Sequence, residues 1–187
     1  MAFYYRKSFN IEQKMYIAGL AVEYIKNNEY IFLDSGSSCY CLSQKMHGFS
    51  NLTVLTNSIP SLEILGETEG VDVITVPGRY HHRRHAIFGH AACDFIEKHR
   101  AGICFIGGYS LMEGYGLMQI SEQDARIKRA YCENADKTVV LFDSTKKDNR
   151  GFYKSIPFEK IDAVVSDSPL PESLNRICEE HGIEVVY

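Results

Sequence analysis

The chain has 187 residues, a length that suits one domain with a substantial core. Hydrophobic residues make up 45% and charged residues 24% of the sequence, the balance of a globular protein, and the net charge is −4 at pH 7. This acidic surplus gives no bulk attraction to nucleic acid or to an anionic membrane, which argues against a chain that binds DNA by itself. No apolar run approaches the ~18 residues that span a bilayer, and the first residues lack the apolar region of a secretory signal.

The six cysteines lie at positions 39, 41, 93, 104, 132 and 178 and form no C-x-x-C pair. Most of them fall within apolar segments, where a reduced cysteine packs as a small core residue. Disulfide frameworks belong to smaller secreted chains with poor cores. We therefore expect reduced thiols and a cytoplasmic protein.

The first predicted element is an amphipathic helix over residues 10–26, with Asn10 as its N-cap and Gln13 in the capping-box position. Its apolar residues recur at helical spacing and predict one buried stripe, made of Ile11, Met15, Ala18, Val22 and Ile25.

Short apolar segments then alternate with helical segments to the end of the chain. The strand-like segments are 30–33, 52–55, 71–76, 103–106, 138–142, 161–165 and 183–186. The helical segments are 38–46, a short one ending at Gly66, 90–99, 121–134 and one starting near Pro171. Strands that are apolar throughout and alternate with helices indicate a parallel sheet covered on both faces. We predict a single α/β domain, a three-layer α/β/α sandwich with a mostly parallel sheet of about seven strands.

Polar clusters follow most of these strands, and ligands of open α/β sheets bind outside the carboxyl ends of the strands. The first cluster is Asp34-Ser35-Gly36-Ser37-Ser38. Its hydroxyls, and the backbone N–H groups at the start of the next helix, suit a phosphate or a carboxylate. The alternative is an ordinary turn in which a serine caps the helix.

Two further clusters are ambiguous in the same way. Thr56-Asn57-Ser58 either supplies hydroxyl and amide donors to a ligand or serves only as the N-cap of the next helix. Asp143-Ser144-Thr145-Lys146 places an acid and a base together, and Lys146 becomes a phosphate partner if it points into a cleft. Lys128 lies in the predicted helix 121–134, either on the surface or at the ligand.

Residues 79–85 are dense in arginine and histidine and have three interpretations: an exposed loop, a lid that faces an anion, or a metal site. The metal site would use His81, His82, His85 and His90. No H-E-x-x-H or C-x-x-C spacing supports it, so we predict no metal and no cofactor. Motifs for nucleophilic or nucleotide chemistry (G-x-S-x-G, Walker A and G-x-G-x-x-G) are also missing from the sequence, and we assign no catalytic residue.

Taken in order, these clusters resemble the C-terminal sensor domain of the DeoR family of bacterial transcriptional regulators. The matching motifs are Phe32–Ser38, Leu52–Ser58, Val76–Arg79, Phe105–Gly108, Gly116-Leu117, Ala125–Ala130, Leu141–Lys146 and Ile161–Asp167. They keep their order and spacing from about residue 8 to the C-terminus. The resemblance implies a fold similar to ribose-5-phosphate isomerase and the CoA transferases. It also implies binding of a phosphorylated sugar or related metabolite, relayed to an N-terminal helix-turn-helix.

The resemblance further implies the ligand-binding residues. The turn at 34–38 would hold the phosphate or a sugar hydroxyl, two glycines would allow close backbone approach, and two lysines would supply positive charge. Asp143 would bond sugar hydroxyls or orient a lysine. The full set is Asp34, Ser35, Gly36, Ser37, Ser38, Thr56, Asn57, Gly78, Arg79, Gly107, Lys128, Asp143 and Lys146.

Residues 10–187 are expected to be the sensing domain, with the helix-turn-helix absent from this chain. Residues 1–9 would be the remnant of an interdomain linker, or else an N-terminal strand or a floppy tail. DNA would be reached only through the missing domain, and a homo-oligomer is expected because DNA-binding units must be presented in pairs.

Two other functions stay open at this stage. The first is a sugar-phosphate isomerase of the same fold, with Asp34, Asp143 or Glu113 as its base. The second is a domain used only for interactions, suggested by Tyr109 and Met118 where the family has smaller or hydroxyl-bearing residues.

Overall fold

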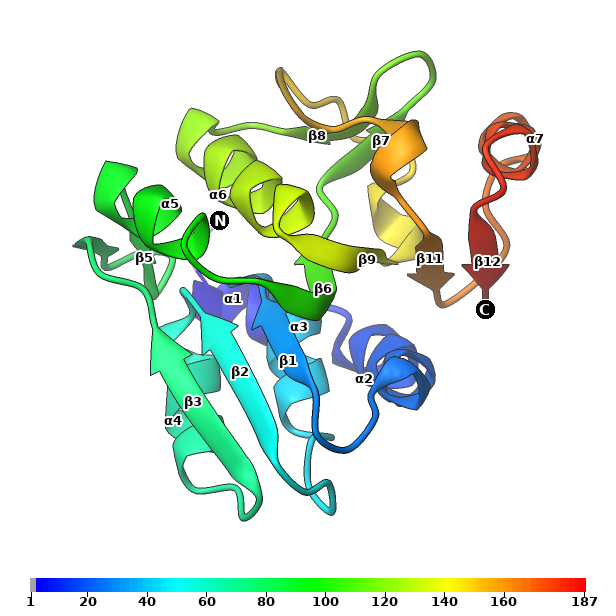
Figure 1. Ribbon diagram of the computed structural model, residues 1–187. Coiled ribbons are helices and arrows are strands. Elements are labelled where there is room, and N and C mark those ends of the chain that lie inside the picture. The colour runs from blue at the N-terminus through cyan, green and yellow to red at the C-terminus, as the bar shows by residue number, and fades with distance from the viewer. Residues whose placement is uncertain (1–2) are drawn as a thin grey trace.

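The computed structural model describes residues 3–187, and its centre is a seven-stranded sheet in the order β12-β11-β9-β6-β1-β2-β3 (Figure 1). All neighbouring strands in it run parallel. The strands are β1 (Tyr30–Leu33), β2 (Leu52–Thr56), β3 (Val71–Thr75), β6 (Ala101–Gly107), β9 (Ala135–Phe142), β11 (Ala163–Ser166) and β12 (Glu184–Val186).

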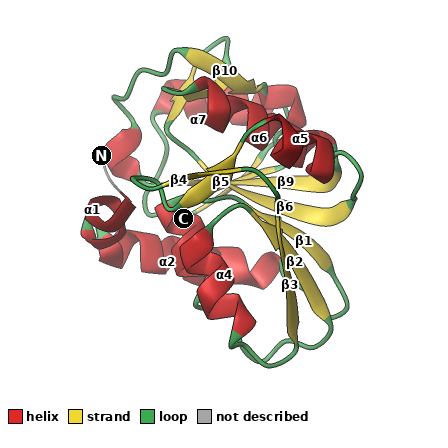
Figure 2. Cartoon of the chain, turned by 90° about the vertical axis from the view of Figure 1, so that its left-hand side faces the viewer, coloured by secondary structure: helices red, strands yellow, loops and turns green. Residues whose placement is uncertain are grey.

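Helices cover both faces of this sheet (Figure 2). One face carries α2 (Ile11–Ala21), α3 (Ser37–Ser43) and α4 (Ile59–Gly66), and the other carries α5 (His90–Ile96), α6 (Glu122–Glu133) and α7 (Glu172–Glu180). Successive strand residues point to opposite faces, so Ile31 and Leu33 pack in one core and Phe32 in the other. The prediction of a three-layer α/β/α sandwich is confirmed.

Two small antiparallel sheets were not predicted. One pairs β4 (Arg79–His81) with β5 (Ala86–Phe88), and the other contains β7 (Ser110–Met112), β8 (Gly116–Gln119) and β10 (Tyr153–Ile156). Residues 79–85 therefore form a strand and the tight turn that follows it. Short 3-10 helices occupy Val22–Tyr24, Ser144–Lys146 and Phe158–Lys160.

The buried face of α2 differs from the predicted stripe. Ile11 is 39% exposed, and the buried residues are Lys14, Ile17, Ala18 and Ala21. Asn10 has a left-handed backbone and makes no side-chain capping bond. Of the predicted stripe, Ala18 and Ile25 are buried, and Met15 and Val22 are half-buried against the core. Lys14, outside that stripe, is buried because its ammonium donates to the carbonyl oxygens of Arg6 and Phe9.

The segment before α2 forms a helix, α1 (Phe3–Ser8), so the expectation of a strand or a floppy tail is wrong for these residues. Phe3 is fully buried, packs edge-on against Tyr40 at 5.6 Å, and donates its N–H to the carbonyl of Arg83 at 2.7 Å. Residues 1 and 2 of the expected linker lie outside the described residues.

The six cysteines carry free thiols, five of them buried and Cys93 partly exposed, as the apolar context of most of them predicted. Between residues 3 and 187, no helix is both long enough and apolar enough to cross a membrane.

Candidate ligand-binding site

The order of the strands reverses between β1 and β6, since the chain leaves β1 for β2 on one side and returns with β6 on the other. Such a switch point is where open α/β sheets bind ligands. Asp34 follows β1, Asn57 lies just beyond β2, Gly107 ends β6 and Asp143 follows β9. These strands are parallel neighbours (Figure 1), so their carboxyl ends, and with them the four residues, lie at one edge of the sheet.

Asp34 is the centre of this edge. Its side chain is 1% exposed, and its Oδ2 accepts the N–H of Gly107 at 3.0 Å and pairs with the ammonium of Lys128 from α6. A Cβ on Gly36 would lie 3.2 Å from the Cα of Gly107 and 3.3 Å from that carboxylate oxygen. The two glycines therefore let the two turns close around a buried carboxylate.

The serines after Asp34 do not cap α3. The capping residue is Gly36, which has no side-chain capping bond. The hydroxyl of Ser35 accepts a hydrogen bond from the amide of Asn57 at 3.2 Å, and the buried hydroxyl of Ser38 has no hydrogen-bond partner among residues 3–187. A buried hydroxyl without a partner is costly, so Ser38 is a donor that a bound ligand would satisfy.

Thr56 and Asn57 hold neighbouring elements together. The hydroxyl of Thr56 donates to the carbonyl of Leu33 at 2.7 Å and is therefore already used. The amide of Asn57 also donates to the carbonyl of Ile87, and its oxygen accepts from Tyr131 at 3.4 Å. The two side chains therefore connect the ends of β1 and β2 with β5 and α6.

Ser58, next in the chain, caps α4: its hydroxyl oxygen accepts the N–H of Ser61 at 3.3 Å. The N-cap interpretation of the 56–58 cluster therefore holds for Ser58.

The end of β9 carries a second charged group. Asp143 is 1% exposed, its ion pair with Lys146 spans 2.8 Å, and it also accepts from the hydroxyl of Thr145. Burial by itself would raise the pKa of Asp143, but Lys146, Thr145 and nearby Lys14 together lower that pKa below its ordinary value. The carboxylate is therefore charged.

A hollow of about 530 Å³ adjoins this group beyond the ends of β9 and β11. Its lining mixes hydroxyls with a cation and apolar side chains: Phe142, Ser144, Thr145, Lys147, Ser166, Ser168, Pro169, Leu170 and Pro171. Asp167 fixes the position of the lining residue Ser144, because its carboxylate accepts the N–H and the hydroxyl of Ser144 at 2.7 and 2.8 Å. The volume falls within the ~300–1,000 Å³ range of small-molecule sites.

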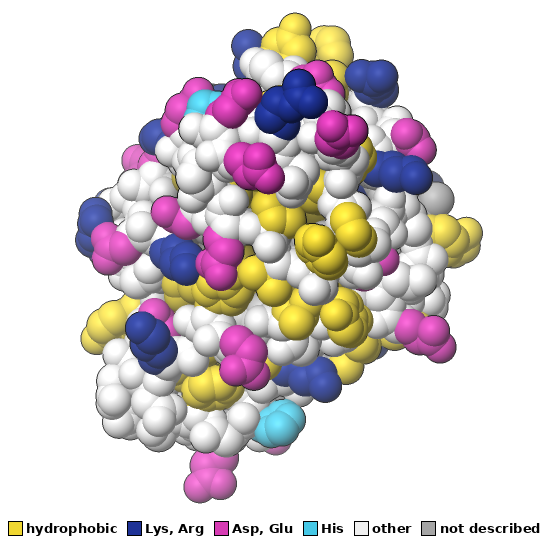
Figure 3. All heavy atoms as spheres, turned by 90° about the vertical axis from the view of Figure 1, so that its right-hand side faces the viewer, with side chains coloured by type: hydrophobic (Ala, Val, Ile, Leu, Met, Phe, Trp, Pro, Cys, Tyr) yellow, Lys and Arg dark blue, Asp and Glu magenta, His cyan; other side chains and the backbone are white. Residues whose placement is uncertain are grey.

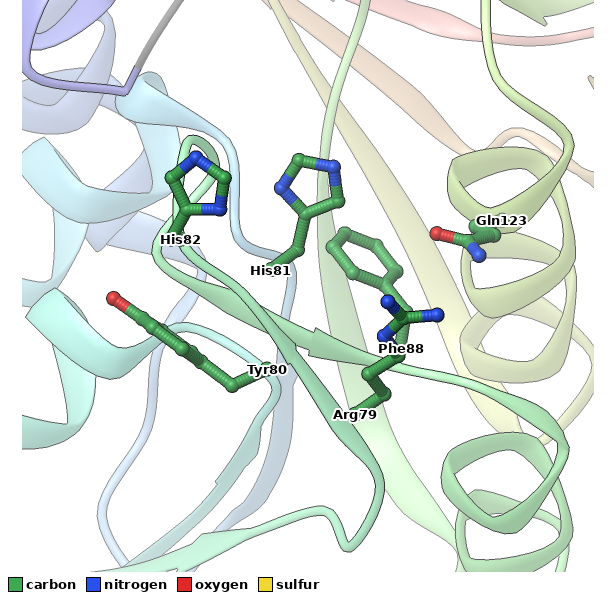
Figure 4. Close-up of a pocket in the computed structure, with 6 residues that line it drawn as sticks. All are labelled: Arg79, Tyr80, His81, His82, Phe88 and Gln123. Atoms are coloured by element: carbon green, nitrogen blue, oxygen red, sulfur yellow. The ribbon is translucent and has the colours of Figure 1, made fainter.

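Gly78 precedes and Arg79 begins the β4–β5 hairpin, whose Ile87 donates its N–H to the carbonyl of Asn57 at 2.8 Å. A Cβ on Gly78 would lie 2.6 Å from the carbonyl oxygen of Phe88, so this glycine serves strand pairing. Arg79 is exposed and lines a separate hollow of about 340 Å³, with Gln123 of α6 facing the hairpin across it (Figure 4). The other lining residues are Tyr80, His81, His82 and Phe88.

No three His, Cys, Asp or Glu side chains within residues 3–187 are arranged to hold a metal ion. His81, His82 and His85 of the hairpin and His90 of α5 form no such group among these residues.

Sequence reasoning missed Lys14 and Arg6 near the edge, and it covered Arg84 only through the interpretation of residues 79–85 as a lid that faces an anion. Lys14 is 3% exposed and lies on the buried face of α2, three residues before Ile17, a spacing that the sequence displays. Arg84, in the β4–β5 turn, pairs with Asp124 of α6. Arg6 comes from α1, which was expected to be linker or tail.

Most of this chain matches a known protein family. The sequence model of the family described as "DeoR C terminal sensor domain" matches residues 9–168.

Curated relatives are regulators from bacteria and archaea. The glycerol-3-phosphate regulon repressor of Escherichia coli is 27% identical over 96% of this chain and 71% of its own length. The HTH-type transcriptional regulator GlpR of Haloferax volcanii is 30% identical over 95% of this chain and 69% of its own length. The HTH-type transcriptional regulator GolR of Listeria innocua is 28% identical over 94% and 69%.

Solved structures share the fold. Ribose 5-phosphate isomerase A from Methanocaldococcus jannaschii gives a TM-score of 0.54 at 17% identity over 74% of this chain. Subunit eIF2B delta from Chaetomium thermophilum gives 0.58 at 15% identity over 87% of it. The chain spans only 55% and 58% of the lengths of these two proteins, and such identities show the fold alone.

Proposed function

The chain belongs to the DeoR C-terminal sensor domain family, and from this premise we propose that it binds a phosphorylated sugar or a related phosphorylated metabolite beside Asp34 and Asp143. As a domain of DeoR-type transcriptional regulators, like the relatives described above, it is not an enzyme. The bound metabolite controls DNA binding by a helix-turn-helix joined to its N-terminal side.

The observation that carries this proposal is a pair of lysine–aspartate contacts at the carboxyl edge of the sheet, the buried Lys128 with Asp34 and the half-buried Lys146 with the buried Asp143. Lysine ammonium groups bind phosphate oxygens, and carboxylates accept hydrogen bonds from sugar hydroxyls. One edge of the sheet thus holds both kinds of group that a sugar phosphate requires.

The remaining polar groups of the edge have complementary tasks. Ser37 and Ser38 lie beside Asp34, and the unused hydroxyl of Ser38 donates to a ligand oxygen. The hollow next to Asp143 receives the carbon chain, where Ser144 and Ser166 face its hydroxyl groups. Gly36 and Gly107 support the site indirectly by keeping Asp34 in position.

Similarity in fold to ribose 5-phosphate isomerase A does not make this chain an isomerase. Asp34 and Asp143, the expected bases of an isomerase, are 1% exposed and ion-paired to lysines. Glu113 lies exposed in the β7–β8 turn.

The intact regulator works as a homo-oligomer in the cytoplasm, where paired DNA-binding units meet operator half-sites. Among residues 3–187, β12 is the last strand on its side of the sheet, and Figure 3 shows a band of hydrophobic side chains across the face on that side. Apolar bands of this kind favour association between subunits.

A thermal-shift panel of sugar phosphates and their unphosphorylated parents tests the proposal. A ligand present at about 100 times its Kd adds ~2.7 kcal/mol of stability, or a Tm rise of roughly 5–11 °C for a domain of this size. The expected result is a rise with phosphorylated compounds only. Equal rises with the parent sugars, or no rise across the panel, would contradict a sugar-phosphate sensor.

A further inference from the structure

Helix α1 packs beside α3 and is fastened at both ends (Figure 1). At its start, the ring of Phe3 packs between Tyr40 of α3 and His85 of the β4–β5 turn, and its N–H bonds the carbonyl of Arg83. At its end, the ammonium of Lys14 donates to the carbonyl of Arg6 at 2.8 Å. The helix thus bridges α2 and α3 to the hairpin that approaches Asn57.

The side chain of Arg6, on this bridge, is half-buried. Its Nε is shielded from solvent and has no hydrogen-bond partner, and Arg6 makes no ion pair in the described part of the chain. A buried guanidinium donor without an acceptor is rare in proteins because its desolvation is not repaid.

Arg6 lies within electrostatic range of Asp34 and Arg84. Burial lowers the pKa of the Arg6 guanidinium, and the charge of Asp34 opposes that change. The pKa of Arg84 is also lowered, first by burial and then by the charge of Arg6, and Asp34 again opposes the change. The two guanidinium groups therefore repel one another, and the charge of Asp34 attracts both.

The charges around Asp34 do not balance. Lys128 pairs with Asp34 and Arg84 pairs with Asp124, which leaves the guanidinium of Arg6 without a carboxylate of its own. Three cations face two carboxylates, so the group carries a surplus of one positive charge. An anion with several acceptor oxygens would remove the surplus and satisfy the Arg6 Nε.

We propose that the guanidinium groups of Arg6 and Arg84 bind the phosphate group of the ligand near the Asp34–Lys128 pair. These contacts hold α1 against the rest of the domain. Arginine suits this role because its planar donors can bond two phosphate oxygens at once. The inference rests on the proposed function and deepens it, since it assigns the phosphate to two arginines outside the predicted set.

A consequence for regulation follows from the position of Arg6 on α1. When phosphate is bound, a segment joined to the N-terminal side of α1 has one orientation relative to the domain. Without phosphate, that segment samples more orientations. Ligand binding then shifts the population between two positions of α1, because only one of them completes the phosphate contacts.

Calorimetry with inorganic phosphate, at fixed ionic strength, tests the inference. The variants are Arg6→Gln and Arg84→Gln, with Arg83→Gln as the matched control because Arg83 is an exposed neighbour in the same turn. We expect the Kd for phosphate to rise about tenfold or more in the first two variants. In the control the Kd should stay within about twofold of the original value, because an exposed charge acts weakly.

A second readout guards against a variant that only disturbs folding. Hydrogen exchange of the amides at 3–8 should slow when phosphate is added to the unaltered chain and should not respond in Arg6→Gln. Arg84→Gln also breaks the ion pair with Asp124. If Arg84→Gln lowers the urea midpoint of unfolding, the result for Arg6→Gln decides the test.

The outcomes separate the two proposals. Sugar phosphates that bind Arg6→Gln as tightly as the unaltered chain overturn the role of Arg6 and leave the sensor function standing. Phosphate binding that needs Arg6, without binding of any sugar phosphate, keeps this inference and refutes the sugar-phosphate effector. Failure of the unaltered chain to bind either refutes both.

Discussion

Removing the carboxylate of Asp34 should destabilise the domain more than breaking any exposed ion pair. Asp34 and Lys128 have side chains 1% and 6% exposed, so Asp34→Ala leaves a buried ammonium without its counter-charge. Such a loss costs about 3–5 kcal/mol, and the N–H of Gly107 loses its acceptor as well. Since domains unfold with about 5–15 kcal/mol, the variant should be marginally folded.

Urea unfolding, followed by far-UV circular dichroism, measures this loss. The internal control is Asp136→Ala, which breaks the pair of Asp136 with Arg100, whose side chains are 58% and 73% exposed. An exposed pair of this kind contributes about 0–1 kcal/mol. The double variant Asp34→Ala with Lys128→Met should recover stability relative to Asp34→Ala alone, because neither buried charge is then unpaired.

The result that would refute this reasoning is a small effect. If Asp34→Ala lowers the free energy of unfolding by less than about 1 kcal/mol, as expected for the exposed pair, Asp34 and Lys128 are not a coupled buried pair. A double variant less stable than Asp34→Ala would also contradict the coupling.

Three further predictions concern pH, glycine and thiols. The lowered pKa of Asp143 stabilises the fold above its ordinary value of 3.8, and this contribution is lost as pH falls through the lower folded-state pKa. The difference in unfolding free energy between the unaltered chain and Asp143→Asn, measured in urea, should therefore be constant near neutral pH and shrink in strong acid; a constant difference throughout would contradict it. Gly36→Ala should lower the free energy of unfolding by about 1–3 kcal/mol because of overpacking. Gly19→Ala in α2, where a Cβ meets nothing within 4 Å, should raise it by about 0.5–1 kcal/mol. Denaturation that ranks the two variants the other way would refute the role of packing at Gly36. Cys93 should be the only thiol that Ellman's reagent modifies quickly in the folded chain, since the other five are buried, and rapid modification of several thiols would show that the core opens.

The fold was predictable because its strands are apolar on both faces. Ile31, Phe32 and Leu33 alternate between two cores, and only a sheet covered on both sides requires such a run. The meeting of Asp34 and Asp143 followed from the same prediction, since parallel strands end at a common edge.

Elements that depend on distant partners were not predictable. Lys14 lies outside the apolar stripe predicted for α2, and its burial is explained by the carbonyl oxygens of Arg6 in α1 and of Phe9 just after α1. The hairpin strands β4 and β5 have three residues each, too few to show an alternating pattern. The pairing of Lys128 with Asp34 joins residues 94 apart in the chain, a contact that no local spacing reveals.

Arg79 illustrates a limit of a different kind. Its family motif at the end of β3 suggested the ligand site, but the backbone beyond Gly78 turns into the hairpin and carries Arg79 to the separate hollow lined by His81 and Gln123. Motif order thus located the strand end correctly, whereas the direction of the following loop depended on its pairing with β5.

A crystal structure of the domain with the sugar phosphate that raises the Tm most tests the central claim directly. We expect phosphate oxygens within about 3 Å of cationic side chains at the carboxyl edge of the sheet, with Lys128 or Lys146 among them and the sugar toward Asp143. Electron density for the ligand in the hollow beside Arg79, or on any other face, would contradict the account.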